Sequence, residues 1–279
     1  MLKSLYWRVN FWLKNKKSNR LQNNLGKDVK AIIVETKNGT FAVEPADLEV
    51  GAKLREKGEY GIDEIKRISQ FIDKNSTVLI VGAHIGSLAI PIAKTCSKVV
   101  AIEANPNNFK LLETNVKLNN TSNITLHNIA ASNKQEVIKF QLNTVNSGGS
   151  KRVPVTNHYM YTYDNPEVID VEAYALDTYI SNEDFDLVFI DIEGSEYFAM
   201  QGMADILGKT KSLIVEFLPH HITNVAGVKL ADFLGNIPGH LTKLTIPSKN
   251  KTYPIDIGIV TLEQMFESGQ GDDGIIFHN

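Results

Sequence analysis

Short apolar runs alternate with segments of helical spacing through the middle of the chain. A run of four to eight apolar residues is typical of a strand buried on both faces, and apolar residues three or four apart are typical of an amphipathic helix. Such an alternation indicates a parallel, doubly wound α/β sheet. The pattern predicts strand 77–81, helix 86–95, strand 98–103, helix 106–118, strand 123–127, strand 186–191, helix 195–206 and strand 212–217.

The flanking regions have different patterns. Residues 31–35 and 40–44 read as a β-hairpin in which Asn38 and Gly39 supply the positive φ angles of the turn. Residues 143–170 have no regular period, which predicts a loop or lid on the acceptor side of a site. The remaining elements are expected to be helix 61–72, helix 228–236 and strands 241–246, 255–261 and 274–278.

Residues 1–25 form a basic N-terminal segment without acidic residues. Leu5, Val9 and Trp12 recur at helical spacing, which predicts an amphipathic helix. Residues 1–20 of such a helix suit peripheral contact with an anionic membrane, but packing on the same domain or on a partner subunit is the commoner arrangement. Residues 26–279 are expected to form the main domain.

Composition narrows the functional classes. The chain has 279 residues, 43% of them hydrophobic, and a net charge of −3. The weak negative charge argues against a nucleic-acid partner. The single cysteine, Cys96, cannot form an internal disulfide, so a cytoplasmic location is expected. The apolar runs are shorter than the roughly 20 residues of a membrane span.

Polar and glycine residues gather where the predicted strands end, which is where open α/β sheets bind their ligands. The first strand ends in the turn GAHIG, in which Gly82 and Gly86 let a ligand approach the backbone. Glu103 ends the next strand and can accept hydrogen bonds from both ribose hydroxyls of a nucleoside. His84 stands where a dinucleotide-binding turn has its second glycine, which disfavours a pyrophosphate. The combination favours a nucleoside ligand such as S-adenosylmethionine.

Several segments in a fixed order resemble the FkbM family of S-adenosylmethionine-dependent methyltransferases. They are VLIVGAHIGSLAI, VVAIEANPNNFKLLETNVKLNN, HNIAAS, NSGGS, ALDTYI and FDLVFIDIEGSEYFAMQGM. The resemblance covers about residues 60–217. Two positions depart from the family pattern: His84 replaces its usual asparagine, and Phe189 replaces a lysine that would lie beside Asp191.

The resemblance implies a class I methyltransferase fold, which is Rossmann-like, with a seven-stranded, mostly parallel sheet and helices on both faces. It also implies O-methylation of a hydroxyl on a sugar, a glycan or a secondary metabolite. Two rivals stay open: a catalytically silent methyltransferase-like binding module, and an NAD-dependent oxidoreductase.

Each candidate residue has a functional and a structural interpretation. An alcohol acceptor needs a base or a metal ion to take its proton. The candidates for contact with the acceptor are Asp191, Glu193, His220 and His221, although these carboxylates also suit a turn or a helix N-terminus and adjacent histidines are often solvated. A divalent metal ion would have Asp191, Glu216 and His220 as ligands. The candidate cofactor contacts are Gly82, Ala83, His84, Gly86, Glu103, Ala104, Asn128, Ala130, Asp191 and Tyr60.

Overall fold

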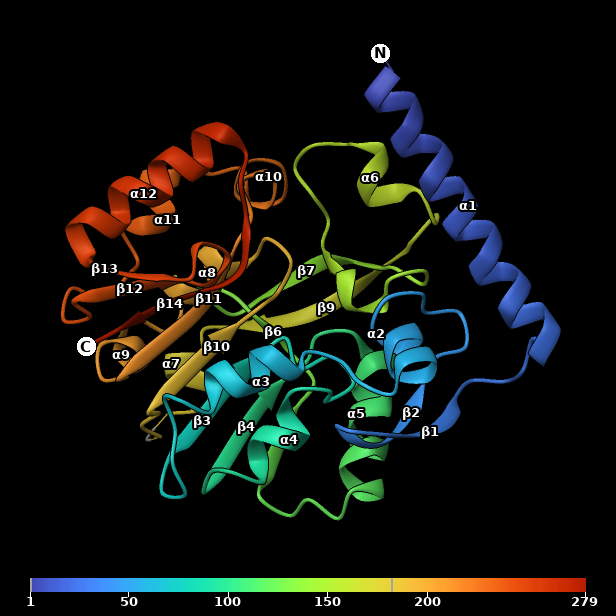
Figure 1. The fold of residues 1–279 in the computed structure, drawn as a ribbon, viewed down its shortest axis with the longest axis horizontal. Helices are drawn as coiled ribbons and strands as arrows, with labels where there is room; N and C mark the ends of the chain where they lie inside the picture. Colours follow the sequence, from blue (N-terminus) through green and yellow to red (C-terminus); the bar gives the residue numbers. More distant parts are fainter. Residues whose placement is uncertain (1, 182) are drawn as a thin grey trace.

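A twisted main sheet of eight strands runs through the part of the protein that the computed structural model describes, residues 2–181 and 183–279 (Figure 1). Five central strands are parallel, and the three at one edge are antiparallel to their neighbours. In spatial order the strands are β13 (Lys251–Pro254), β12 (Lys243–Ile246), β14 (Asp272–His278), β11 (Ser212–Phe217), β10 (Leu187–Ile190), β3 (Thr77–Val81), β4 (Lys98–Ile102) and β5 (Ile124–His127).

The strand order reverses between β3 and β10. From β3 the chain proceeds outward through β4 to β5, and it later returns to β10 on the other side of β3. Val81 pairs with Ile190, and the N–H of Asp191 donates to the carbonyl of Val81 over 3.0 Å. The carboxyl ends of β3 and β10 therefore lie together at the topological switch point, where α/β sheets bind ligands.

Helices cover both faces of the main sheet because successive strand residues point to opposite sides. On one face α8 (Glu196–Gln201), α9 (Ala204–Leu207), α11 (Leu230–Leu234) and α12 (Ile255–Ser268) cover Leu79, Val81, Val188, Ile190, Leu213 and Val215. On the other, α3 (Ile62–Ile68), α4 (Ala89–Ala93) and α5 (Pro106–Leu118) cover Val78, Ile80, Leu187, Phe189 and Ile214.

A second sheet of four strands lies beside the carboxyl end of the main sheet, and the sequence analysis did not predict it. It contains, in order, β6 (Ala130–Ala131), β9 (Glu167–Tyr174), β7 (Glu136–Leu142) and β8 (Lys151–Arg152). The segment 143–170, expected to be irregular, thus supplies β8, the start of β9 and the short helix α6 (Tyr159–Thr162). The remaining short α-helices are α2 (Val50–Ala52), α7 (Leu176–Tyr179) and α10 (Pro219–His221). Two π-helices, η1 (Lys53–Lys57) and η3 (Ile222–Ala226), follow α2 and α10, and the 3-10 helices are η2 (Ser147–Gly149) and η4 (Pro247–Lys249).

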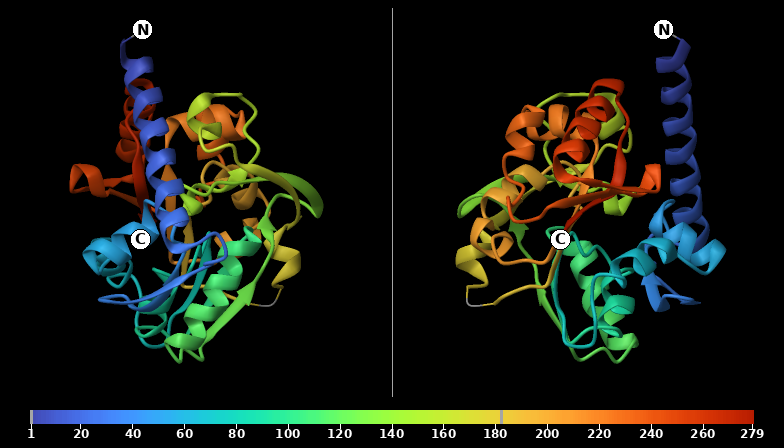
Figure 2. Two further views of the ribbon diagram at one scale, coloured as in Figure 1. Left: turned by 90° about the vertical axis from the view of Figure 1, so that its right-hand side faces the viewer. Right: turned by 60° about the vertical axis from the view of Figure 1, so that its left-hand side comes forward.

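The N-terminal helix α1 (Leu2–Leu25) lies along the outer edge of the molecule, beside α6 (Figures 1 and 2). Phe11 packs toward the domain, whereas Val9, Trp12 and Leu13 are exposed. The predicted helix and its packing on the same domain, the commoner arrangement, are therefore confirmed. Apolar side chains occur on both sides of α1, so the expected single apolar stripe was wrong for Val9 and Trp12, and the side chain of Leu5 lies outside the described residues. None of the helices described combines the length and apolar character that a membrane span requires.

The hairpin β1 (Ile32–Thr36) and β2 (Gly39–Val43) pairs as expected, with one difference in its turn. Gly39 has a positive φ of 133°, but Asn38 does not. Instead, Asn38 is buried, and its amide donates to the carbonyls of Tyr60 and Ser87. Asn38 therefore ties the hairpin to the main domain.

Three other expectations were wrong. The main sheet has eight described strands instead of seven because β13 adds to its edge. Residues 255–261 begin helix α12, in which Ile255, Ile259 and Leu262 meet the core at helical spacing. The helix expected over 195–206 divides at Gly202, where the carbonyl of Ser132 approaches so closely that a Cβ would lie 1.9 Å from it.

Candidate functional site

Two adjoining cavities meet at the switch point between β3 and β10. The first, called the apolar cavity, has mainly apolar walls, and its lining includes Glu103, Ala104, Ile129, Ala130, Phe140 and Asp191. The second, called the acidic chamber, is lined by Glu49, Glu64, Asp191, Glu193, Glu216 and Asp273 together with Lys53 and Tyr60. Gly82, His84 and Asp191 border both, so they mark the junction.

Glu103 and Asp191 are the two carboxyl groups that line the apolar cavity, and Glu103 lies at its predicted nucleoside side. It follows β4 and is 6% exposed. Its two oxygens accept from the N–H of His84 at 2.7 Å and the N–H of Asn105 at 2.8 Å. Burial raises the pKa of this carboxyl to about 7, against the lowering effect of these hydrogen bonds. Each carboxylate oxygen has a further lone pair, so the group can also accept from ligand hydroxyls.

The glycines of the GAHIG turn have a structural role, because their backbone conformation and close packing leave no room for a side chain. Gly82 has φ of 95°, and a Cβ there would lie 1.8 Å from the carbonyl oxygen of Asp191. Gly86 has φ of 89° and packs against Leu112. The close approach of the two strand ends therefore requires glycine at 82, and the backbone of Gly82 also borders both cavities. The predicted contact of Gly82 and Gly86 with a ligand stays a prediction.

His84 adopts a left-handed conformation, with φ of 51°, which is uncommon for a residue with a side chain. Its Nε2 lies 2.8 Å from the hydroxyl of Ser147, which in turn donates to Asp47 at 2.6 Å. These contacts join the turn after β3 to the Gly-Gly-Ser segment. Burial lowers the pKa of His84, which favours the neutral ring.

Asp191 stands at the junction of the cavities, and the described residues form no hydrogen bond to its carboxylate. Burial raises its pKa well above the ordinary value, and the negative charges of Glu216 and Glu193 add to the effect. Phe189, where the family pattern has lysine, is itself fully buried and lines the chamber. A carboxylate in this environment is a stronger base than an ordinary aspartate.

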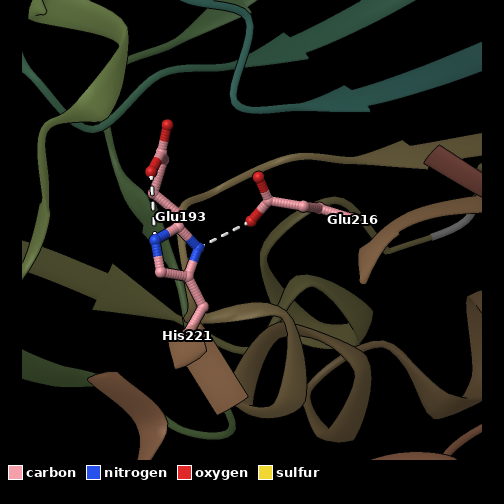
Figure 3. A group of neighbouring side chains, drawn as sticks. All are labelled: Glu193, Glu216 and His221. Atoms are coloured by element: carbon pink, nitrogen blue, oxygen red, sulfur yellow. Dashed lines mark hydrogen bonds and ion pairs between the residues drawn. The ribbon is translucent and has the colours of Figure 1, made fainter. Parts of the chain in front are cut away.

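A cluster of Glu193, Glu216 and His221 centres on the ring of His221 (Figure 3). Glu193 and Glu216 line the acidic chamber together with Asp191. Nδ1 of His221 lies 2.9 Å from Glu216 Oε2, and Nε2 lies 3.5 Å from Glu193 Oε2. The ammonium of Lys151 donates to Glu193 at 2.7 Å and lies 3.4 Å from His221 Nε2. Burial and the adjacent Lys151 lower the pKa of His221 to about 4, so the ring is neutral at pH 7. Because both ring nitrogens face protein groups, His221 positions its neighbours and is not a free base.

His220, which was expected to contact the acceptor, lies outside the acidic chamber. It lines a third cavity, between α1 and α6, together with Phe11, His158 and Tyr159. Its ring stacks on His221 and on Tyr161, with centroids 4.3 and 6.3 Å away. The structure therefore separates His220 from the acidic chamber.

The predicted metal set of Asp191, Glu216 and His220 was wrong. The described group with suitable ligand geometry is Glu193, Glu216 and His221, whose ligand atoms lie within 4.8 Å of one another. The ammonium of Lys151 already contacts two of these three residues. The cluster therefore already contains one protein cation, which pairs with Glu193.

Adding EDTA is expected to leave turnover unchanged, because Lys151 supplies the positive charge that a divalent ion would bring. The measurement is the initial rate of methyl transfer with and without EDTA, after dialysis against the chelator. A rate that falls and returns on adding Mg²⁺ would contradict this interpretation.

The other residues that were predicted to contact the cofactor lie in different parts of the site. Ala104 and Ala130 line the apolar cavity, whereas Ala83 and Tyr60 line the acidic chamber. Asn128 has a supporting role, since its amide donates to the carbonyl of Glu103 at 2.8 Å.

Five charged residues of the site were missed by the sequence analysis: Glu49, Lys53, Glu64 of α3, Lys151 of β8 and Asp273 of β14. Lys151 is only 6% exposed. Each lies in a segment far from the motifs at the strand ends, and a lysine in a turn-rich region carries no local sign of burial. Only the packing of the second sheet brings Lys151 to Glu193.

The site agrees with a family comparison. The model described as "Methyltransferase FkbM domain" matches residues 81–243, more than half of the chain. No curated protein matches the chain significantly.

Solved structures show more distant similarity. An FkbM methyltransferase from Methylobacillus flagellatus has 14% identity and a TM-score of 0.43, over 82% of this chain and 60% of that one. M. jannaschii TYW2 in complex with AdoMet has 17% identity and a TM-score of 0.38, over 67% and 62%. A putative transferase from Pyrococcus horikoshii has 14% identity and a TM-score of 0.45, over 90% of this chain and 73% of that one. The chain thus spans about three fifths of the length of the first two.

Proposed function

Because the chain belongs to the FkbM family of methyltransferases, we propose that it transfers a methyl group from S-adenosylmethionine to a hydroxyl of a sugar or another small metabolite. The observation that carries the proposal is the position of Asp191. Its carboxylate has no hydrogen-bond partner within the described residues and borders both cavities.

The apolar cavity fits the nucleoside part of this cofactor. Ile129, Ala130 and Phe140 offer apolar walls to an adenine ring, and Glu103 offers a buried carboxylate to the ribose hydroxyls. The acidic chamber adjoins it and has carboxylates for a polyhydroxylated acceptor. The cofactor supplies the methyl group on a positively charged sulfur.

Proton removal is the task of the protein. An alcohol attacks poorly until a base takes its proton. Above its raised pKa Asp191 is ionised and would accept the hydroxyl proton. The acceptor oxygen would then take the methyl group as the carbon–sulfur bond breaks, and the electron pair of that bond would stay on the sulfur of S-adenosylhomocysteine. Glu193 and His221 hold the neighbouring side chains in place, so the acceptor meets a fixed geometry.

Calorimetric titration with S-adenosylhomocysteine, with NAD in parallel, tests the cofactor. Binding of the homocysteine compound alone supports the proposal, and binding of NAD alone favours an oxidoreductase. Incubation with isotope-labelled S-adenosylmethionine and a panel of hydroxyl acceptors, including sugars, then tests the reaction. Label found on oxygen in the product is expected, whereas cofactor binding without transfer to any acceptor would favour a binding module.

Glu103→Ala is expected to weaken binding of S-adenosylhomocysteine by about 1.5–3 kcal/mol, because it removes one to two charge-assisted hydrogen bonds. The wild-type affinity should also weaken as pH falls below about 7, since protonation of Glu103 removes the charged acceptor. Calorimetry at several pH values measures both effects.

Glu113→Ala is the matched control, since Glu113 is exposed on the neighbouring helix α5. It should leave both the affinity and its pH dependence unchanged. Unaltered affinity in a folded Glu103→Ala protein would refute the assignment of Glu103.

A further inference from the structure

One face of α1 is fixed against the domain. The ring of Phe11 stacks on Tyr163 with centroids 4.4 Å apart, and the hydroxyl of Ser18 donates to the carbonyl of Ala46 at 2.7 Å. Asn15 donates to the carbonyl of Tyr163 at 3.2 Å. Phe11, Asn15 and Ser18 recur at helical spacing, so they define the inner face and hold the helix in one orientation.

The opposite side of α1, here called its outer face, is apolar toward its N-terminus and basic after that. It consists of Val9, Trp12, Leu13, Lys16 and Arg20, with Lys17 at its edge, where the ammonium lies 3.9 Å from Glu56 of the domain. Val9, Trp12 and Leu13 are 48%, 50% and 51% exposed. The ammonium of Lys16 lies 4.0 Å from the centroid of the Trp12 ring. Helix α1 contains no acidic residue, although the whole chain has a net charge of −3.

We propose that the outer face of α1 docks on an anionic membrane surface. Tryptophan suits the interface between lipid headgroups and hydrocarbon, because its ring is apolar and its N–H is polar. Lysine and arginine beside it are attracted to anionic headgroups. The inner face of α1 packs on the domain, so only the outer face can enter the headgroup region and the contact is superficial. Trp12 inserts between the headgroups, and the basic residues attract the helix to the anionic surface.

A protein partner fits this surface less well. A standard protein interface uses about 20–30 residues on each side, whereas the outer face offers six along one helical stripe. Its charges have one sign, which suits a uniformly anionic surface better than a second copy of the same basic helix.

Vesicle flotation of the full chain tests the proposal. Binding is expected to vesicles that contain about 30% phosphatidylglycerol in phosphatidylcholine, and it should fall as salt rises. Vesicles of phosphatidylcholine alone should bind weakly. Absence of binding to the anionic vesicles, or equal binding to both kinds, would overturn the proposal.

Two variants locate the contact. Lys16→Ser with Arg20→Ser should weaken binding roughly fivefold for each charge, about 25-fold together. Trp12→Ser should weaken binding to the same vesicles and make the remainder more sensitive to salt. Both variants should keep the wild-type affinity for S-adenosylhomocysteine, which shows that the domain is folded.

Lys134→Ser with Lys249→Ser is the matched control, since it removes two exposed charges far from α1 in the sequence. A loss of binding equal to that of the α1 variant would show nonspecific attraction and would contradict the proposal. A concentration-dependent dimer that Trp12→Ser abolishes would instead identify a second copy of the chain as the occupant and would also overturn it.

Discussion

Asp191→Asn is expected to lower turnover by about 100- to 10,000-fold, the usual contribution of a general base. Asparagine has nearly the same shape but cannot accept the proton of the acceptor hydroxyl. The carboxylate borders both cavities and forms no hydrogen bond with the described residues, so its loss should disturb the fold little. Cofactor affinity should change much less than turnover.

The pH dependence distinguishes a base from a residue that only shapes the site. Wild-type turnover should fall as pH drops through the raised pKa of Asp191, because only the ionised carboxylate accepts a proton. Steady-state rates across pH measure this, and Asp191→Asn should lose the corresponding limb. Asp63→Asn, at a carboxylate whose side chain is 86% exposed, is the control and should behave as wild type. Near-normal turnover of Asp191→Asn would remove Asp191 from the mechanism.

Lys151→Met is expected to destabilise the protein by about 3–5 kcal/mol, because it leaves a buried carboxylate cluster without its cation. The side chains of Lys151 and Glu193 are 7% and 21% exposed, and the ion pair between them is 2.7 Å long. Methionine has a similar length, so the packing volume is largely kept. The pKa of His221 should rise from about 4, since the adjacent ammonium helps to lower it.

Denaturant unfolding measures the stability of this variant, and NMR titration follows the histidine. Lys139→Met is the matched control: it lies on the neighbouring strand β7 with its side chain 67% exposed, and its surface ion pair is worth at most about 1 kcal/mol. Equal stabilities of the two variants would show that the buried pair contributes no more than a surface pair.

The sign of the pH effect follows from the two shifted groups. The pKa of Glu193 is lowered on folding, so its stabilisation is present above its ordinary value of 4.5 and is lost as pH falls below it. The pKa of Lys151 is raised, so its part is present below its ordinary value of 10.5 and is lost above it. The stability difference between wild type and Lys151→Met should therefore be largest between these values.

The positions of the parallel strands along the chain show how much of the fold the local apolar pattern predicts. The parallel strands β3, β4, β10 and β11 correspond to predicted runs, because a strand buried on both faces leaves a nearly continuous apolar signature. The edge strand β5 was also predicted, although it is only partly buried. The strand predicted at residues 255–261 was wrong because a short apolar segment rich in isoleucine is compatible with a strand or a helix. Helix α12 forms there because its apolar side chains cover the sheet.

The sequence by itself determined the alternating α/β pattern, the turn after the first central strand and the acids at the strand ends, including Glu103 and Asp191. These follow from local periodicity and from the rule that parallel strands end at one edge. Only the tertiary structure decided that Lys151 neutralises Glu193, that His221 joins this cluster while His220 faces α1, and that no described residue forms a hydrogen bond to the carboxylate of Asp191. These contacts form between segments that are distant in the sequence and that bury one another's polar groups. The spacing of neighbouring residues does not indicate such burial.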